Sequence, residues 1–458
     1  MPRLSIPRPF EIAVALLVVT ISSGCGRVEW NDDLEYPART SPLVQMEKHP
    51  DQGPPGFPPP GKAPVVPEWL IARGVSVLDP ASLANHEWSA RWLSSLKEET
   101  TRHFGSPGKP RTGSVDTPQL ASLANDLGLS ETKLAEGARL YRRLCVQCHG
   151  ISGDGVGAAS FWLSPAPRDL RSGDFKFIST AEHKLPTGFQ PLKARPRTED
   201  LVKTLKGGLE GTSMPSFALL GDSSLESLAA YVIHLSLRGE LEQTVLLGAL
   251  RQDRETIQAI AKNPAQEELA RYKRMLATTL EWEDPDADVD DFVAKQSSPS
   301  IPAFAEKFLD RVMREYAAAN KNPIVVPAYP YPGNLPTPAS SVIAGHTIFK
   351  AQCVNCHADY GRQSDLRFEI WGSVVRPANL TISQYKGGRR PIDLYHRIAR
   401  GIPPCAMPKA NLGDSDPAKA GWDLVNFLLA LPHPDQIPEE IRPQIYGPAP
   451  QPKAGAKQ

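Results

Sequence analysis

Two copies of the pattern Cys-x-x-Cys-His are the residues of this chain best suited to chemistry. They are Cys145-Val-Gln-Cys148-His149 and Cys353-Val-Asn-Cys356-His357. The pattern is the attachment signature of c-type haem. Two thiols so spaced on a short helical turn can form thioethers to the two vinyl groups of one porphyrin, and the adjacent histidine then lies under the iron. A zinc site or a thiol redox pair is the alternative, but two copies favour two covalently bound haem c groups.

Each iron needs a second axial ligand, and two methionine–proline pairs are placed to supply it. Met214 and Met407 each precede a proline, and each lies downstream of its own haem motif. His183 and His396 are alternatives, although neither has a histidine counterpart in the other half of the chain. Methionine beside histidine raises the potential of a haem. The predicted axial pairs are His149 with Met214 and His357 with Met407.

The surroundings of the two motifs form an internal repeat. In each half a glycine stands eight residues before the first cysteine, and an aromatic residue stands four before it. These are Gly137 and Tyr141 in the first half and Gly345 and Phe349 in the second. Later matches are Pro167-Arg-Asp-Leu170 with Pro377-Ala-Asn-Leu380, Gly208 with Gly401, and Leu228, Tyr231 and Leu235 with Leu424, Phe427 and Leu431. The repeat predicts that one fold occurs twice.

Each half resembles a class I c-type cytochrome domain. In that family a first helix ends in the haem motif, a proline-containing loop crosses the proximal side, a methionine loop closes the distal side, and a final helix packs against the first. The resemblance implies a mainly α fold with two tandem domains, at 126–240 and 336–434, joined by a helical insertion. It also implies that the carbonyl of Pro167, of Pro377, or of a neighbour accepts a hydrogen bond from the proximal histidine. The first and last helices are expected to meet at the matched glycine and aromatic positions.

Other residues near these motifs have both a chemical and a plain interpretation. Trp162 and Trp371 could line the haem pocket or belong to the protein core. Arg168 and Arg376 could meet haem propionates through charge-assisted hydrogen bonds or lie in solvent. Cys405 has no partner among the cysteines, so it is either a reactive thiol or a small buried residue in the methionine loop.

The amino terminus reads as an export signal. Two arginines precede a ten-residue apolar stretch, Ile12–Ile21, which is too short to span a bilayer comfortably. Small residues and Cys25 follow, as in a bacterial lipoprotein signal. Lipidation of Cys25 is therefore predicted, with ordinary cleavage or an uncleaved anchor as alternatives. The rest of the chain is then extracytoplasmic, in the periplasm, and anchored to the membrane.

Composition and periodicity divide the rest of the chain. Proline makes up 46 of 458 residues, about 10%, against a usual ~5%, so part of the chain is predicted to be extended. Helical patterns recur at 266–282 and 305–319. The predicted order is a signal segment at 1–25, a proline-rich tether at 26–78, an extra helical segment at 79–125, cytochrome domain 1 at 126–240, a helical insertion and linker at 241–335, cytochrome domain 2 at 336–434, and a disordered tail at 435–458.

Charge and motifs together indicate an electron carrier rather than an enzyme. Lys plus Arg and Asp plus Glu both total 51, and a net charge of zero argues against a nucleic-acid partner. The segments GTSMPSF (211–217) and PAPRDL (165–170) resemble cytochrome subunits of respiratory complexes. We expect single electrons to pass from a quinol-oxidising complex or a dehydrogenase to a terminal acceptor such as an oxidase. The alternatives are a di-haem cytochrome c peroxidase, which needs one open iron, and a structural haem subunit of a membrane complex.

Overall fold

The computed structural model describes most of the chain between residues 87 and 447. The described residues are 34–37, 39, 43–46, 75–78, 87–111, 117–181, 194–251, 301–331, 333, 337–365, 367–368, 374–402 and 407–447. Their regular structure is helical apart from two short antiparallel pairs of strands. These are β1 (Leu43–Met46) with β2 (Val75–Leu78), and β3 (Arg367–Phe368) with β4 (Val374–Val375). The mainly α fold class predicted from the sequence is confirmed.

Helices on both sides of the first haem motif share one hydrophobic core. They are α3 (Glu87–Phe104), α4 (Pro118–Asp126), α5 (Glu131–Leu144), α6 (Val146–His149), α7 (Thr198–Gly207), α8 (Asp222–Arg251) and α12 (Ile301–Lys321), with the 3-10 helices η3 (Leu170–Ser172) and η4 (Ala218–Leu220). The 3-10 helix η2 (Ser160–Trp162) lies outside this core. The long helix α8 packs against α3, α5, α7 and α12. It is therefore buried on nearly every side between Leu228 and Val245.

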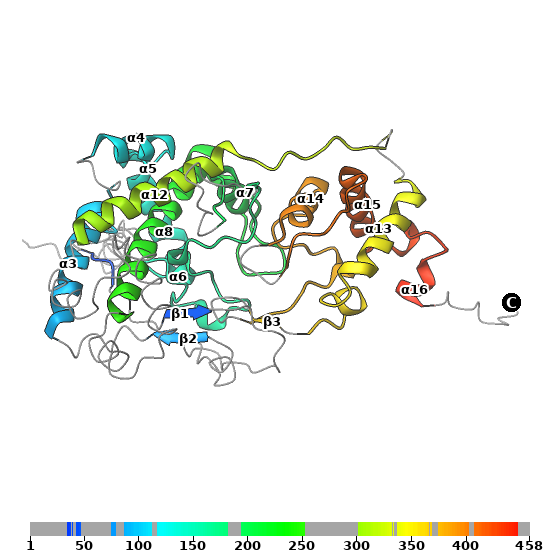
Figure 1. Ribbon diagram of the computed structural model, residues 1–458, viewed down its shortest axis with the longest axis horizontal. Helices are drawn as coiled ribbons and strands as arrows, with labels where there is room; N and C mark the ends of the chain where they lie inside the picture. The colour runs from blue at the N-terminus through cyan, green and yellow to red at the C-terminus, as the bar shows by residue number, and fades with distance from the viewer. Residues whose placement is uncertain are drawn as a thin grey trace, which may run out of the picture.

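The second half is smaller and repeats the central part of this arrangement (Figure 1). Its elements are α13 (Ala339–Gln352), η5 (Ala358–Gly361), η6 (Leu380–Ile382), α14 (Pro391–Arg400), α15 (Pro417–Ala430), η7 (Pro434–Gln436) and α16 (Arg442–Tyr446). Helices α13 and α15 pack against each other as α5 and α8 do, and α14 packs on α15 as α7 packs on α8. Each half thus places its haem motif at the end of one helix of a crossing pair.

The first and last helices of each half cross at a glycine, as the repeat predicts. A Cβ atom at Gly137 would stand 2.1 Å from the carbonyl oxygen of Ser227 on α8. A Cβ atom at Gly345 would stand 2.1 Å from the carbonyl oxygen of Asp423 on α15. One aromatic pair closes each crossing: Tyr141 with Tyr231, ring centroids 5.2 Å apart, and Phe349 with Phe427, 5.4 Å apart. The predicted contact between first and last helices is confirmed in both halves.

Replacing Gly137 by alanine should therefore destabilise the protein, although alanine is the better helix former. The added methyl group meets backbone, so α5 and α8 must separate, and we expect a loss of ~3 kcal/mol, the upper end for overpacking. Thermal unfolding followed by circular dichroism measures it. Gly207→Ala is the matched control, because a Cβ atom there has no neighbour within 4 Å. Equal melting temperatures for Gly137→Ala and the wild type would contradict the close crossing.

The prediction of a disordered tail at 435–458 is wrong for residues 435–447. Ile437, Ile441 and Ile445 are at most 5% exposed and belong to the core of the second half. Three isoleucines at a spacing of four place one apolar face against that core. Of the prolines that suggested disorder, Pro443 stands in the first turn of α16, where the missing amide proton costs no helical hydrogen bond. Residues 448–458 lie outside the described residues.

The segments predicted to lie outside the two domains pack more closely than plain linkers would. The hydroxyl group of Tyr36, in the predicted tether, lies 3.0 Å from that of Tyr231 on α8. The helical pattern at 305–319 is confirmed within α12, which shares the core of the first half. After α12, the indole of Trp422 on α15 donates to the carbonyl of Pro327 at 2.9 Å. The helical pattern at 266–282 lies outside the described residues.

The predicted export signal and Cys25 also lie outside the described residues. Within the part of the chain that the structure describes, no helix has both the length and the apolar character needed to cross a membrane.

Candidate functional site

Each haem motif begins where the first helix of its half ends. α5 ends at Leu144 and α13 at Gln352, one residue before the first cysteine. In both halves the backbone amide of this first cysteine donates to the backbone carbonyl of the aromatic residue four positions earlier, at 2.8 Å. The backbone amide of the histidine donates to the carbonyl of the same cysteine, also at 2.8 Å. The helical turn therefore continues through the motif, and both thiols and the imidazole leave one short turn of backbone. All four thiols are half-buried.

The two proximal histidines are held in the same way. Nδ1 of His149 lies 3.0 Å from the carbonyl oxygen of Arg168, and Nδ1 of His357 lies 3.0 Å from that of Ala378. Because a carbonyl only accepts, each Nδ1 carries the proton and each Nε2 offers its lone pair to a metal. Burial lowers the pKa of both imidazoles, so both are neutral at pH 7, as metal coordination requires. The accepting carbonyls belong to the residues after Pro167 and Pro377, within the range that the resemblance implies.

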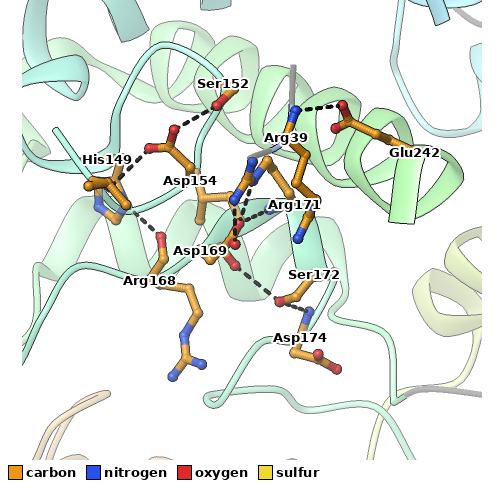
Figure 2. A network of polar contacts seen from close by, with 12 residues as sticks. Arg39, His149, Ser152, Asp154, Arg168, Asp169, Arg171, Ser172, Asp174 and Glu242 are labelled. Atoms are coloured by element: carbon orange, nitrogen blue, oxygen red, sulfur yellow. Dashed lines mark hydrogen bonds and ion pairs between the residues drawn. The ribbon is translucent and has the colours of Figure 1, made fainter. Parts of the chain in front are cut away.

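The residue after each accepting carbonyl fixes the loop that presents it. Asp169 accepts from the amide of Arg171 at 2.9 Å, and Asn379 accepts from the amide of Thr381 at 3.0 Å. Short polar side chains favour such turns. In Figure 2 the guanidinium of Arg171, which is 4% exposed, also lies along the carboxylate of Asp169, with contacts of 3.0 and 2.9 Å. This two-pronged pair, with a buried guanidinium and a half-buried carboxylate, stabilises the first loop.

The two methionine loops close with the same backbone hydrogen bonds. α7 and α14 are capped by Gly208 and Gly401, with φ of +65° and +75°. The amide after each glycine donates to the methionine carbonyl: Leu209 to Met214 at 3.1 Å and Ile402 to Met407 at 3.0 Å. The amide three residues after each methionine returns to the helix: Phe217 to Leu205 at 3.0 Å and Ala410 to Ile398 at 2.9 Å. Only glycine adopts this φ readily, so the matched glycines set the shape of both loops.

These donor groups suit haem c better than zinc or thiol redox chemistry. A redox pair of cysteines needs a lowered pKa, yet burial raises the pKa of Cys145 to about 12 and that of Cys353 to about 11. A structural zinc site needs four protein ligands. Among the described residues, no group of three or more His, Cys, Asp or Glu could hold a metal ion. A thioether-linked haem with one histidine and one methionine per iron fits what remains.

The alternative ligands receive no support from the structure. His183 lies outside the described residues. His396 lies on α14, where the charges acting on it come from Lys203 and Asp200 of α7 and from Asp393. His396 therefore lies on the side of α14 that is close to α7.

Five further residues named from the sequence have different outcomes. Trp162 is 87% exposed, so of its two interpretations the one that places it in the protein core is wrong. The guanidinium of Arg376 donates to the carbonyl of Ser364 at 2.9 Å and so ties down its own loop. The side chain of Arg168 points away from the cluster around Asp169 in Figure 2. Trp371 and Cys405 lie outside the described residues.

Comparison with known proteins agrees with this geometry. The family model of cytochrome c oxidase, cbb3-type, subunit III matches residues 132–232, which hold the first haem motif and Met214. Residues 132–232 form a c-type cytochrome domain. Haem c is therefore a cofactor of this chain, and electron transfer through haem is its chemistry.

Two other comparisons, with curated proteins and with solved structures, add no support to this assignment. No curated protein matches the chain. A chain of the reducing HAO-like protein complex of Kuenenia stuttgartiensis matches with a TM-score of 0.38 and 20% identity, over 65% of this chain and 95% of that chain. The cytochrome domain at 132–232 thus rests on its own motif, its methionine loop and the family model.

Sequence reasoning missed two features that shape the cytochrome domain, whereas the carbonyl that accepts from His149 lies in the range that the resemblance implied. The ion pair of Arg171 with Asp169 was missed, although the shared Pro-x-Asp/Asn-Leu pattern marks the turn. Tyr36 and its hydroxyl contact with Tyr231 had no signal in the sequence, because the two residues are 195 positions apart.

Proposed function

We propose that this chain is a di-haem electron carrier outside the cytoplasm, which passes single electrons between a respiratory donor and a terminal acceptor. The observation that carries the proposal is the repeated geometry of the two halves. Each has a haem turn at a helix end, a histidine whose Nδ1 meets a carbonyl at 3.0 Å, and a methionine loop closed from a glycine. The second half therefore has every group that the c-type cytochrome domain uses.

The protein's residues position and enclose the haem. When bound, haem c supplies one-electron chemistry at its iron. His149 and His357 present neutral Nε2 atoms, and the loops of Met214 and Met407 are each pinned by two backbone hydrogen bonds. Proline after each methionine further restricts these loops. His149 with Met214, and His357 with Met407, would hold each iron without a free position for peroxide, which would suit electron transfer.

An uncharged loop beside the first haem motif offers a face to a redox partner. The twelve residues from Val156 to Pro167 include no charged side chain. Phe161 is 55% exposed and Trp162 87% exposed. The amide of Ala159 donates to the carbonyl of Gln147 in the haem turn at 2.7 Å, so the loop lies against that turn. Exposed apolar clusters mark interaction sites, and this one adjoins the group that exchanges electrons.

The proposed partners and location follow from the same features. The donor is a quinol-oxidising complex or a dehydrogenase, and the acceptor is a terminal oxidase. The likeness of 132–232 to a subunit of a cytochrome c oxidase supports the acceptor. Covalent haem attachment and the signal-like amino terminus support the periplasm, with lipidated Cys25 as the membrane anchor. Two acyl chains would anchor it stably.

Ligand binding by the wild-type protein separates the carrier from a di-haem peroxidase. The reduced carrier should bind carbon monoxide poorly and consume peroxide slowly, because both irons are six-coordinate in both oxidation states. Optical titration with carbon monoxide, at full and at half reduction, measures this. A peroxidase must open one iron after the other is reduced. Strong carbon monoxide binding or rapid peroxide turnover by the half-reduced protein would establish the peroxidase instead.

A further inference from the structure

Helices α7 and α14 occupy the same place in the repeat, and they face each other across the two halves (Figure 1). The third residue of each helix is an aspartate, and its side chain caps the amino terminus of that helix. Asp200 accepts from the amide of Arg197 at 3.0 Å, and Asp393 accepts from the amide of Arg390 at 3.3 Å. Three residues further on, α7 carries Lys203 and α14 carries His396. The two surfaces that meet therefore occupy equivalent positions in the two halves.

The contacts between these helices run in both directions, as in a two-fold dimer. The ammonium group of Lys203 forms an ion pair with Asp393, the counterpart of Asp200. His396, the counterpart of Lys203, lies in the electrostatic field of Asp200. In an isologous interface, residue i meets j and residue j meets i. Lys203 of the first half thus meets the capping aspartate of the second, and its counterpart His396 interacts electrostatically with the capping aspartate of the first.

A third contact lies where the axis of such a dimer would pass. Phe177 stands ten residues after Pro167, and Gly387 stands ten after Pro377. A Cβ atom at Gly387 would be 2.4 Å from the ring of Phe177. A residue that meets its own counterpart marks a two-fold axis. Glycine in one half leaves room there for the aromatic ring of the other.

We propose that the α7–α14 contact is an internal isologous interface that locks the two haem-binding halves in one relative position, with Lys203 and Asp393 as its charged positioning pair. The proposal rests on the proposed function only in its consequence, which is that this position sets the rate of electron exchange between the two haems. The docking itself involves protein groups alone.

The interface can set that rate because each helix leads directly into a methionine loop. α7 ends at Gly207 and α14 at Arg400, each just before the loop of Met214 or Met407. The first loop also reaches the second half, since a Cβ atom at Gly211 would be 3.5 Å from the side chain of Gln384. Moving α14 relative to α7 would therefore move one methionine loop relative to the other.

The segment between the halves is anchored to both of them, which limits how far they separate. Near its start, the amide of Ile324 donates to the carbonyl of Ser179 in the first half at 2.7 Å. Further on, the carbonyl of Pro327 accepts from Trp422 of the second half. Short anchored chains raise the effective concentration of the two surfaces. One ion pair and one aromatic contact can then suffice for docking.

Asp393 makes the pair sensitive to substitution because its side chain is only 2% exposed. In the docked form it has two cationic partners, Lys203 and Arg390, the latter at 3.0 Å. A carboxylate at position 203 would face this buried carboxylate across the interface. Removing one partner of a desolvated pair is costly, and a like charge adds repulsion. Lys203→Glu should therefore shift the equilibrium from docked to separated halves by roughly thirtyfold or more.

Two measurements on the full-length holoprotein test the proposal. In Lys203→Glu, small-angle X-ray scattering should show a larger radius of gyration and maximum dimension. After photoreduction, exchange between the haems should slow. Lys203→Arg should behave as the wild type, because it keeps the cation. Lys206→Glu is the matched control on the same helix, since Lys206 pairs with Asp222 of its own half at 2.7 Å.

The outcomes separate docking from haem content. A scattering profile of Lys203→Glu that matches the wild type overturns the interface. An expanded profile with unchanged exchange between the haems overturns its role in setting the rate. Haem content and helicity are measured on each variant. A wild-type chain with one haem would overturn the di-haem function while the scattering test of docking still stands.

The pH dependence of docking gives a second, independent test of the interface, because His396 can be protonated. Desolvation and the cations Lys203 and Arg197 lower the pKa of His396, against the opposing pull of Asp200 and Asp393. Separation returns the imidazole to water and its pKa toward 6.5, so the neutral form favours docking. Docking is full above pH 6.5 and weakens as the pH falls below it. Scattering at pH 7.5 and 5.5 should show expansion of the wild type but less in His396→Gln; equal expansion of both would remove His396 from the interface.

Discussion

Intact mass spectrometry of the mature protein should give a mass that exceeds the polypeptide by two haem groups. The reason is the pair of haem turns, whose thiols lie half-buried on one helical turn each. Replacing Cys145 and Cys148 together by serine should remove one haem, and replacing Cys353 and Cys356 should remove the other. Each loss is complete, because covalent attachment needs the thiols. The pyridine haemochrome spectrum counts the remaining haem independently.

Cys405→Ser is the matched control for this experiment. It removes the sixth cysteine, which belongs to neither haem motif, so both haems should remain. A wild-type chain with one haem would limit the proposal to the c-type cytochrome domain at 132–232. Bound zinc in place of either haem would restore the metal-site alternative for that motif.

Replacing either methionine ligand should open one iron at a time. In Met214→Leu and Met407→Leu, the altered haem should bind carbon monoxide, and its potential should fall by on the order of 0.1 V, a fraction of the ~0.8 V range that axial ligands span. The thioether favours ferrous iron, so its loss lowers the potential. Spectroelectrochemical titration resolves the two haems and shows which one has changed.

Met313→Leu provides the control for these variants. Met313 is fully buried on α12, which packs against α3, α4 and α8, and a swap of similar volume in a core costs little. Its two potentials should match those of the wild type. If either loop variant keeps its potential, that methionine is not a ligand, and His183 or His396 becomes the candidate again.

The variants Gly137→Ala and Lys203→Glu test two different features of the structure. Gly137→Ala tests the packing that positions a haem turn within one half. Lys203→Glu tests how the two halves are placed relative to each other. We expect Gly137→Ala to lose stability. We expect Lys203→Glu to keep its stability while its scattering profile expands.

The chemistry of this chain could be predicted from the sequence because it is local. The thiols and the imidazole of each motif lie within one helical turn, so their spacing alone fixes what they can bind. The methionines are distant, but the repeat marked them by their matched glycines at 208 and 401. The helix crossings at Gly137 and Gly345 followed from the same repeat. Whether a second haem is bound stays a prediction.

Other features depended on contacts between residues far apart in the sequence. The carbonyls of Arg168 and Ala378 belong to the backbone, which every residue has, so residue type could not identify them. Ile437, Ile441 and Ile445 stand among prolines that suggested disorder, and only the core of the second half shows what they cover.

The sequence by itself determined the two haem-binding motifs, the repeat and the mainly α class. Only the tertiary structure decided that α12 and Tyr36 complete the first half, and that Lys203 meets Asp393. The reason is physical. Attachment chemistry needs a few atoms within one turn of helix, whereas an interface depends on which faces of two helices meet. That choice is made by burial and charge summed over both surfaces, and no short segment contains it.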